Sequence, residues 1–123
     1  ILNFGHTIGH AIEAITAYGR YLHGEAIAIG QVAAAWLSSQ RLGMPAAEVS
    51  AIRELFQAAG LPVSIRLGAA DRRRLFGAMR LDKKVSGGAV RFVLCPRIGE
   101  AVRGQPVADE EIHAALDTVG GGE

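Results

Sequence analysis

The chain has 123 residues, of which 50% are hydrophobic and 20% charged, and its formal net charge is +1. These values fit one soluble domain with a hydrophobic core, and they exclude the strong charge bias of a nucleic-acid-binding or membrane-surface protein. Cys95 is the only cysteine, which excludes an internal disulfide and a cysteine zinc cluster. A single cysteine fits a reducing cytoplasm, where we expect the protein to lie. Residues 26–37, the longest apolar stretch, are too few to span a bilayer.

The first predicted helix, residues 5–17, carries two of the four histidines. His6 and His10 are four residues apart, so both project from one helix face, and His23 follows close enough to return to that face. Imidazole is a common zinc ligand, and a catalytic zinc usually has three protein ligands. Thr7 after His6 excludes the His-Glu-x-x-His protease signature. The spacing fits a metal and proton-transfer site, but it fits a structural histidine pair equally well.

A second helix is predicted to follow His23 and to run to about Leu42, where Gly43 stops it, and its apolar character on most sides indicates burial. Pro45 opens a third helix that Gly60 ends. Its apolar stripe is predicted to be core: Val49, Ile52, Leu55, Phe56 and Ala59. Glycines inside helices are costly, so close packing of backbone or ligand is expected at four of them: Gly5, Gly9, Gly24 and Gly30.

The last third of the chain is predicted to form a helix over residues 70–79, a β-hairpin and a final helix. The hairpin pairs residues 89–94 with 101–103 around a turn at 97–100. The final helix, residues 109–119, has an apolar face, and His113 lies off it at the surface. No glycine-rich turn follows a strand, so the chain is not a dinucleotide-binding domain.

Several motifs agree in order and spacing with one family. The string from Asn3 to Glu13, Asn-Phe-Gly-His-Thr-Ile-Gly-His-Ala-Ile-Glu, and the string from Leu22 to Gly30 resemble 3-dehydroquinate synthase in its C-terminal helical domain. Asp82-Lys83-Lys84, residues 91–94 and Ile98-Gly99 are also similar to that family. The resemblance implies a mainly α fold, a helical bundle with one small β-hairpin. Residues 1–123 would form a single metal- and substrate-binding domain, without the family's N-terminal NAD-binding domain.

The resemblance implies an enzyme of the shikimate pathway of aromatic amino acid biosynthesis. The parent would convert 3-deoxy-D-arabino-heptulosonate 7-phosphate to 3-dehydroquinate and phosphate as a lyase. It would require NAD and Zn²⁺ or Co²⁺, and it would be a homodimer. NAD would bind mainly to the N-terminal domain, which also supplies a Glu metal ligand and further substrate-binding residues. We therefore expect the 123-residue chain alone to be inactive.

The same resemblance implies a role for each motif residue. His6 and His23 would be metal ligands, and His10 would be the general acid and base, for which imidazole suits neutral pH. Asn3 would contact substrate oxygens. Lys83 or Lys84 would meet a substrate carboxylate or phosphate, and the sequence does not decide between these two lysines.

Three other functions are compatible with parts of the pattern. A related sugar-phosphate cyclase, such as a 2-deoxy-scyllo-inosose or valiolone synthase, shares much of the chemistry. A metal-dependent alcohol dehydrogenase of the glycerol dehydrogenase type also has a His-x-x-x-His pair and a later His. A non-catalytic helical interaction domain with incidental histidines is the third alternative.

Overall fold

The computed structural model describes the backbone of residues 4–16, 21–85 and 90–120, and the side chains of these residues except 80–85. The described part is mainly helical and contains one two-stranded antiparallel sheet, as the sequence predicted. The elements in chain order are α1 (His6–Ile15), α2 (His23–Leu42), α3 (Ala46–Ala58), α4 (Ala69–Val85), β1 (Arg91–Arg97), β2 (Glu100–Pro106) and α5 (Asp109–Thr118).

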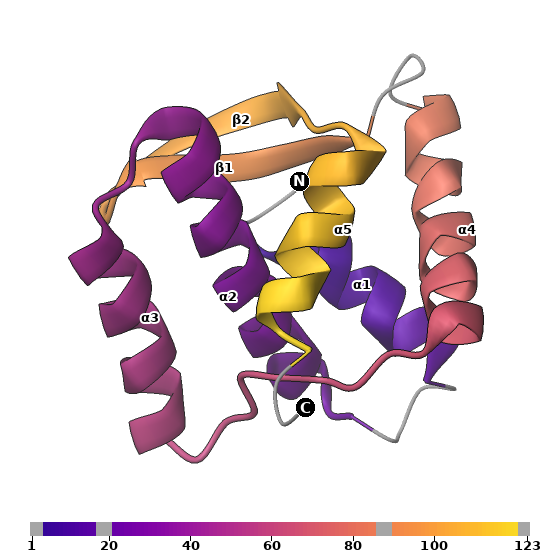
Figure 1. Cartoon of the computed structure of the whole chain (residues 1–123), viewed down its shortest axis with the longest axis horizontal. Coiled ribbons are helices and arrows are strands. Elements are labelled where there is room, and N and C mark those ends of the chain that lie inside the picture. The colour runs from indigo at the N-terminus through magenta and orange to yellow at the C-terminus, as the bar shows by residue number, and fades with distance from the viewer. Residues whose placement is uncertain (1–3, 17–20, 86–89, 121–123) are drawn as a thin grey trace.

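Helix α2 lies in the middle of the molecule and contacts α1, α3, α5 and β1 (Figure 1). Helix α3 flanks it on one side, α4 packs against α1 on the other, and the hairpin crosses one end. The helix begins where the Glu25 carboxylate accepts a hydrogen bond from the Leu22 N–H at 2.8 Å, and it ends at Gly43 in the left-handed conformation. Buried residues lie on most sides of α2, which confirms its predicted burial.

Helices α1 and α2 approach so closely that only glycine fits between them. A Cβ added at Gly30 would overlap the carbonyl oxygen of Gly5 and lie 2.8 Å from the nitrogen of Gly9. A Cβ at Gly9 would lie 3.2 Å from the carbonyl oxygen of Ala26. Residue 5 therefore lies against residue 30 and residue 9 against residue 26, so the helices run antiparallel. This register brings the end of α1 beside the start of α2.

The close packing predicted for glycines is thus confirmed at Gly5, Gly9 and Gly30, whereas no described backbone packs against Gly24. A Cβ at Gly24 would meet nothing within 4 Å. Gly5 also differs from the prediction in another way, because it is the N-cap of α1 with φ of 82° and not a helical residue. An L side chain there would be strained as well as obstructed by Gln31.

The predicted core stripe of α3 is wrong. None of its residues is fully buried and the Leu55 side chain is 66% exposed, although Phe56 is partly buried against the core. The sequence periodicity correctly gave an amphipathic helix, but it did not say what the apolar face packs against. In the described structure α3 contacts α2, and the rest of that face lines an open apolar groove.

The prediction for α4 ended too early. The helix was expected over residues 70–79, whereas it extends to Val85 and includes Asp82-Lys83-Lys84. Residues 79–85 contain no glycine or proline, so the sequence offers no helix-breaking residue before Gly87.

The hairpin is joined to the helices by two hydroxyl groups. Thr7 Oγ1 donates to the Arg91 carbonyl at 3.1 Å, which connects α1 with β1. The buried Ser38 hydroxyl accepts from the Cys95 N–H at 2.8 Å and donates to the Ala34 carbonyl at 2.8 Å. Both polar groups are therefore satisfied where they are removed from water.

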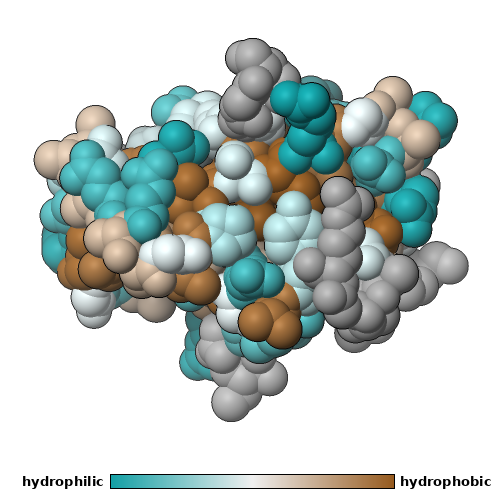
Figure 2. Space-filling model, turned by 90° about the horizontal axis from the view of Figure 1, so that it is seen from below, coloured by the Kyte–Doolittle hydropathy of each residue, from teal (hydrophilic) through white to brown (hydrophobic). Residues whose placement is uncertain are grey.

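Helix α5 covers α2 with the apolar face that the sequence predicted, because Ile112, Ala115, Leu116 and Val119 are all buried. His113 is exposed, as expected, and its ring stacks on Phe76 with 4.4 Å between ring centroids. None of the described helices combines the length and the hydrophobicity needed to cross a membrane. In the view of Figure 2, hydrophobic surface shows in hollows between hydrophilic and neutral side chains.

An ion pair connects α5 with the end of α2, and it predicts a pH dependence. The Glu111 carboxylate accepts from the Ala108 N–H at 2.9 Å and pairs with Arg41 at 2.8 Å. The backbone hydrogen bond, followed by the Arg41 contact, lowers the pKa of Glu111. A lowered carboxyl pKa gives stability that is present above the pKa of the unfolded chain and lost as the pH falls through the folded one.

Glu111→Gln should therefore reduce the free energy of unfolding by about 1 kcal/mol at pH 7. The difference from the wild type should shrink below about pH 4, near the ordinary glutamate pKa. Urea denaturation at pH 7 and pH 3 measures it, with Glu110→Gln in the same helical turn as the control for loss of charge. An equal difference at both pH values would contradict the prediction.

Candidate functional site

Three histidines meet at one end of the crossing between α1 and α2. The ring centroids of His6 and His10 are 4.9 Å apart, and the His23 ring is 5.8 Å from that of His6 and 5.9 Å from that of His10. His6 and His10 lie on successive turns of α1, and His23 is the first residue of α2. The antiparallel register set by the glycines brings these rings together.

Glu13 joins the three histidines, although the sequence reasoning gave it no role. Its Oε1 lies 3.0 Å from Nδ1 of His23. One donor atom each from His10, Glu13 and His23 lies within 4.8 Å of the others. The spacing could have revealed it, because Glu13 follows His6 by seven residues and His10 by three, which places it on the same helix face.

The chemistry of this donor set suits a divalent metal ion. Imidazole nitrogen and carboxylate oxygen are the ligand types of catalytic zinc sites, and such sites keep a position open for water or substrate. His6 is half-buried, whereas His10 and His23 are exposed, so the cluster is open on one side. Burial lowers the pKa of His6, and the neighbouring His10 and His23 lower it further when protonated. A neutral imidazole, which can ligate a metal, is thereby favoured at position 6.

The donor set of the structure differs in part from the set implied by sequence resemblance. The resemblance implies His6 and His23 as ligands and His10 as the acid and base. In the structure the set whose donor atoms lie within 4.8 Å of one another consists of His10, Glu13 and His23. Both sets contain His23, and all four side chains lie in one cluster.

All three predicted substrate-binding side chains lie outside the described part of the structure. Asn3 lies outside the described residues. The backbone of Lys83 and Lys84 belongs to the last turn of α4, but their side chains are also outside the described part. These three assignments remain predictions.

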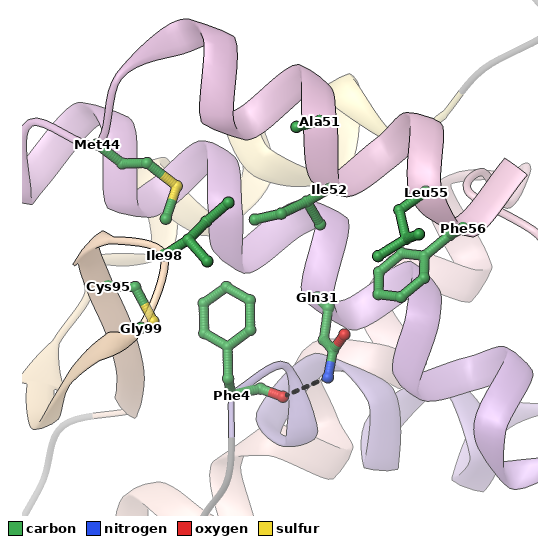
Figure 3. Close-up of a pocket in the computed structure, with 10 residues that line it drawn as sticks. All are labelled: Phe4, Gln31, Met44, Ala51, Ile52, Leu55, Phe56, Cys95, Ile98 and Gly99. Carbon is green, nitrogen blue, oxygen red and sulfur yellow. Dashed lines mark hydrogen bonds between the residues drawn. The ribbon is translucent and has the colours of Figure 1, made fainter. Parts of the chain in front are cut away.

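A second hollow is apolar and lies apart from the histidine cluster. This groove of about 510 Å³ lies between α3, the hairpin turn and the residues before α1 (Figure 3). In Figure 3 the side chains of Phe4, Ile52 and Ile98 point into it, and Gln31 Nε2 donates to the Phe4 carbonyl at 3.3 Å. Cys95 also lines it, and burial raises the pKa of its thiol, which makes the reactive thiolate scarcer. The described residues of the groove therefore offer packing surface and no catalytic group.

The fold defines the class of protein. The structure is similar to that of a 2-epi-5-epi-valiolone synthase from Streptomyces hygroscopicus subsp. jinggangensis, solved with NAD⁺ and Zn²⁺, with a TM-score of 0.79 and 29% identity. This likeness covers 94% of the present chain and 31% of the other. A 2-deoxy-scyllo-inosose synthase, solved with carbaglucose-6-phosphate, NAD⁺ and Co²⁺, has a TM-score of 0.73 and 29% identity over 94% of this chain and 34% of that one. The chain thus has the helical fold found in sugar-phosphate cyclases.

The sequence comparisons identify the family within this class. It belongs to the 3-dehydroquinate synthase C-terminal family, whose model matches residues 1–85, as the motifs predicted. The 3-dehydroquinate synthase of Bordetella pertussis is 51% identical over 119 residues, which cover 95% of this chain and 32% of that protein. That of Acidithiobacillus ferrooxidans is 53% identical over 103 residues, covering 83% and 28%. The chain therefore spans about a third of the length of these curated relatives.

Proposed function

We propose that this chain is the metal- and substrate-binding part of a 3-dehydroquinate synthase. The full enzyme would convert 3-deoxy-D-arabino-heptulosonate 7-phosphate to 3-dehydroquinate and phosphate in the cytoplasm, as a homodimer. One observation carries the proposal: in a chain of this family, the ring centroids of His6, His10 and His23 lie within 5.9 Å of one another. Family membership supports the reaction, and the cluster supplies groups that such a reaction needs.

In this proposal His6 and His23 hold a Zn²⁺ or Co²⁺ ion, as the donor chemistry of the cluster allows. The bound ion would supply charge that lowers the pKa of a coordinated hydroxyl and polarises a carbonyl. A further ligand would come from the part of the enzyme that these residues do not include. Both cyclases of similar fold were solved with NAD⁺ and with Zn²⁺ or Co²⁺, which supports these two cofactors.

His10 is proposed to move protons for the substrate hydroxyl and phosphate. Its side chain is exposed on the open side of the cluster, where a substrate can reach it. Imidazole has an ordinary pKa near neutrality and can therefore both accept and donate a proton there. Asn3 and one of Lys83 and Lys84 would orient the substrate through its oxygens and its carboxylate or phosphate.

NAD would bind mainly outside these residues. The described residues form one two-stranded antiparallel sheet, whereas a dinucleotide-binding domain is built on a parallel sheet with helices on both faces. We therefore expect no turnover from the 123-residue chain alone, even with NAD and zinc added.

A related sugar-phosphate cyclase is the second candidate, favoured by the fold likeness to the valiolone and scyllo-inosose synthases. Sequence identity to those two proteins is 29%, against 51% to the Bordetella pertussis synthase. The heptulosonate phosphate is therefore the preferred substrate class.

A chimera tests the choice of substrate. The present chain would replace the matching region of the Bordetella pertussis enzyme, and phosphate release would be measured with the heptulosonate phosphate and with glucose 6-phosphate. We expect NAD- and metal-dependent release from the heptulosonate phosphate only. Release from glucose 6-phosphate alone would favour the second candidate, and a folded chimera that converts neither substrate would count against both.

A further inference from the structure

We propose that Glu13 is a positioning residue, whose carboxylate orients the imidazole of His23 toward the metal ion. This inference rests on the proposed function, in which His23 is a metal ligand. It assigns Glu13 a task that the sequence motifs did not: Glu13 fixes which ring nitrogen of His23 keeps a free lone pair for the ion.

The contact between the two side chains is direct. Glu13 Oε1 and His23 Nδ1 are 3.0 Å apart, which is hydrogen-bond distance. The side chain of His23 is 59% exposed, so packing holds it weakly, whereas that of Glu13 is only 14% exposed. The better-buried carboxylate is thus the fixed partner, and the exposed ring is the group that it orients.

The backbone holds both residues in place for this contact. The glycine crossing sets the antiparallel register that puts the last turn of α1 beside the first residue of α2. The start of α2 is fixed by the hydrogen bond from Leu22 N–H to Glu25 at 2.8 Å. Glu13 and His23 therefore meet where the last turn of α1 packs beside the start of α2.

The chemistry of imidazole gives the contact its consequence. A neutral ring carries one N–H donor and one nitrogen with a free lone pair. With Nδ1 donating its proton to Glu13, the lone pair lies on Nε2, which becomes the metal-binding atom. A carboxylate behind a ligating histidine also makes that histidine a stronger ligand, and losing such a partner typically weakens metal binding about 10–100-fold.

Glu13 could instead be a ligand itself, since its carboxylate lies within 4.8 Å of donor atoms of His10 and His23. The two roles predict different effects of Glu13→Gln on metal binding. Glutamine at position 13 keeps an oxygen that can accept the His23 N–H, but a neutral amide is a poor zinc ligand. The positioning role is favoured because Oε1 is already within hydrogen-bond distance of the His23 ring.

The first experiment measures the affinity of the purified chain for Zn²⁺ by competition with a chromophoric chelator. Glu13→Ala should bind about 10–100-fold more weakly than wild type, and Glu13→Gln should recover most of that loss. Circular dichroism verifies that each variant is folded, and His113→Ala is the control for loss of a surface imidazole. Equal affinity of Glu13→Ala and wild type would overturn the proposal, as would an equal loss in Gln and Ala.

The second experiment needs no metal and therefore separates this inference from the proposed function. Long-range proton–nitrogen NMR at about pH 8, where imidazoles are neutral, reports which nitrogen of His23 carries the proton. We expect the Nδ1–H form in wild type and Glu13→Gln, and a shift toward Nε2–H in Glu13→Ala. An Nε2–H ring in the wild type would refute the positioning role. Absence of zinc binding together with an Nδ1–H ring would instead refute only the metal site.

Discussion

Gly30→Ala is expected to destabilise the chain by about 3 kcal/mol, at the upper end of the usual cost of overpacking. The added methyl group would overlap the Gly5 carbonyl oxygen and lie 2.8 Å from the Gly9 nitrogen. Both obstructing atoms belong to the backbone, so no side-chain rotation relieves the overlap and the helices must separate. Urea denaturation measures the loss, which corresponds to a fall in melting temperature on the order of 10 °C.

The same substitution at Gly77 is the matched control. Gly77 lies on the exposed side of α4, and a Cβ there would meet nothing within 4 Å. Gly77→Ala should therefore stabilise the chain by about 0.5–1 kcal/mol through helix propensity alone. If both variants changed stability in the same direction and by the same amount, the close crossing of α1 and α2 would not exist as described.

The sequence predicted the helices and the hairpin well because each carries a local signal. Helix α2 is the clearest case, since it was expected to follow His23 and stop at Gly43, and it spans His23–Leu42 with Gly43 as its C-cap. The hairpin turn was expected around Ile98 and Gly99, and it lies there with Gly99 at φ of 95°. Hydrophobic period and turn-forming glycine are properties of neighbouring residues, so a sequence can show them.

The packing of α3 could not be read from the sequence. Its apolar stripe has the same period as a buried helix, but burial depends on what lies opposite, which is a property of distant residues. Leu55 and Ile98 are exposed on the apolar groove in spite of their hydrophobicity. The periodicity therefore identified the apolar face of α3 correctly, but it did not show which part of the molecule packs against that face.

The candidate site could be predicted only in part, because some of its contacts follow from local spacing and others depend on distant residues. The spacing of His6 and His10 places them on one helix face, and this needs only the helical repeat. The approach of His23 depends on the glycine crossing, whose register no local rule supplies. Glu13 was overlooked because its partner is ten residues away on another helix, although its own position shares the histidine face.

Alanine substitutions of His10 and His23 are expected to have different effects on the metal content and the activity of the chimera. His10→Ala should keep its metal and lower kcat about 10²–10⁴-fold, the usual contribution of a general acid and base. His23→Ala should lose the metal, and activity with it. Metal content after gel filtration and the rate of phosphate release measure the two effects separately.

The variants His6→Ala and His10→Ala decide which donor set holds the metal. If His6 and His23 are the ligands, His6→Ala must lose metal while His10→Ala retains it. If the closer set of His10, Glu13 and His23 holds the ion, the pattern reverses: His10→Ala loses metal and His6→Ala retains it. The His113→Ala control lies on α5 against Phe76 and should change neither metal content nor rate. Because His23 belongs to both sets, full metal content in His23→Ala would exclude both and remove the physical basis for a metal at this cluster.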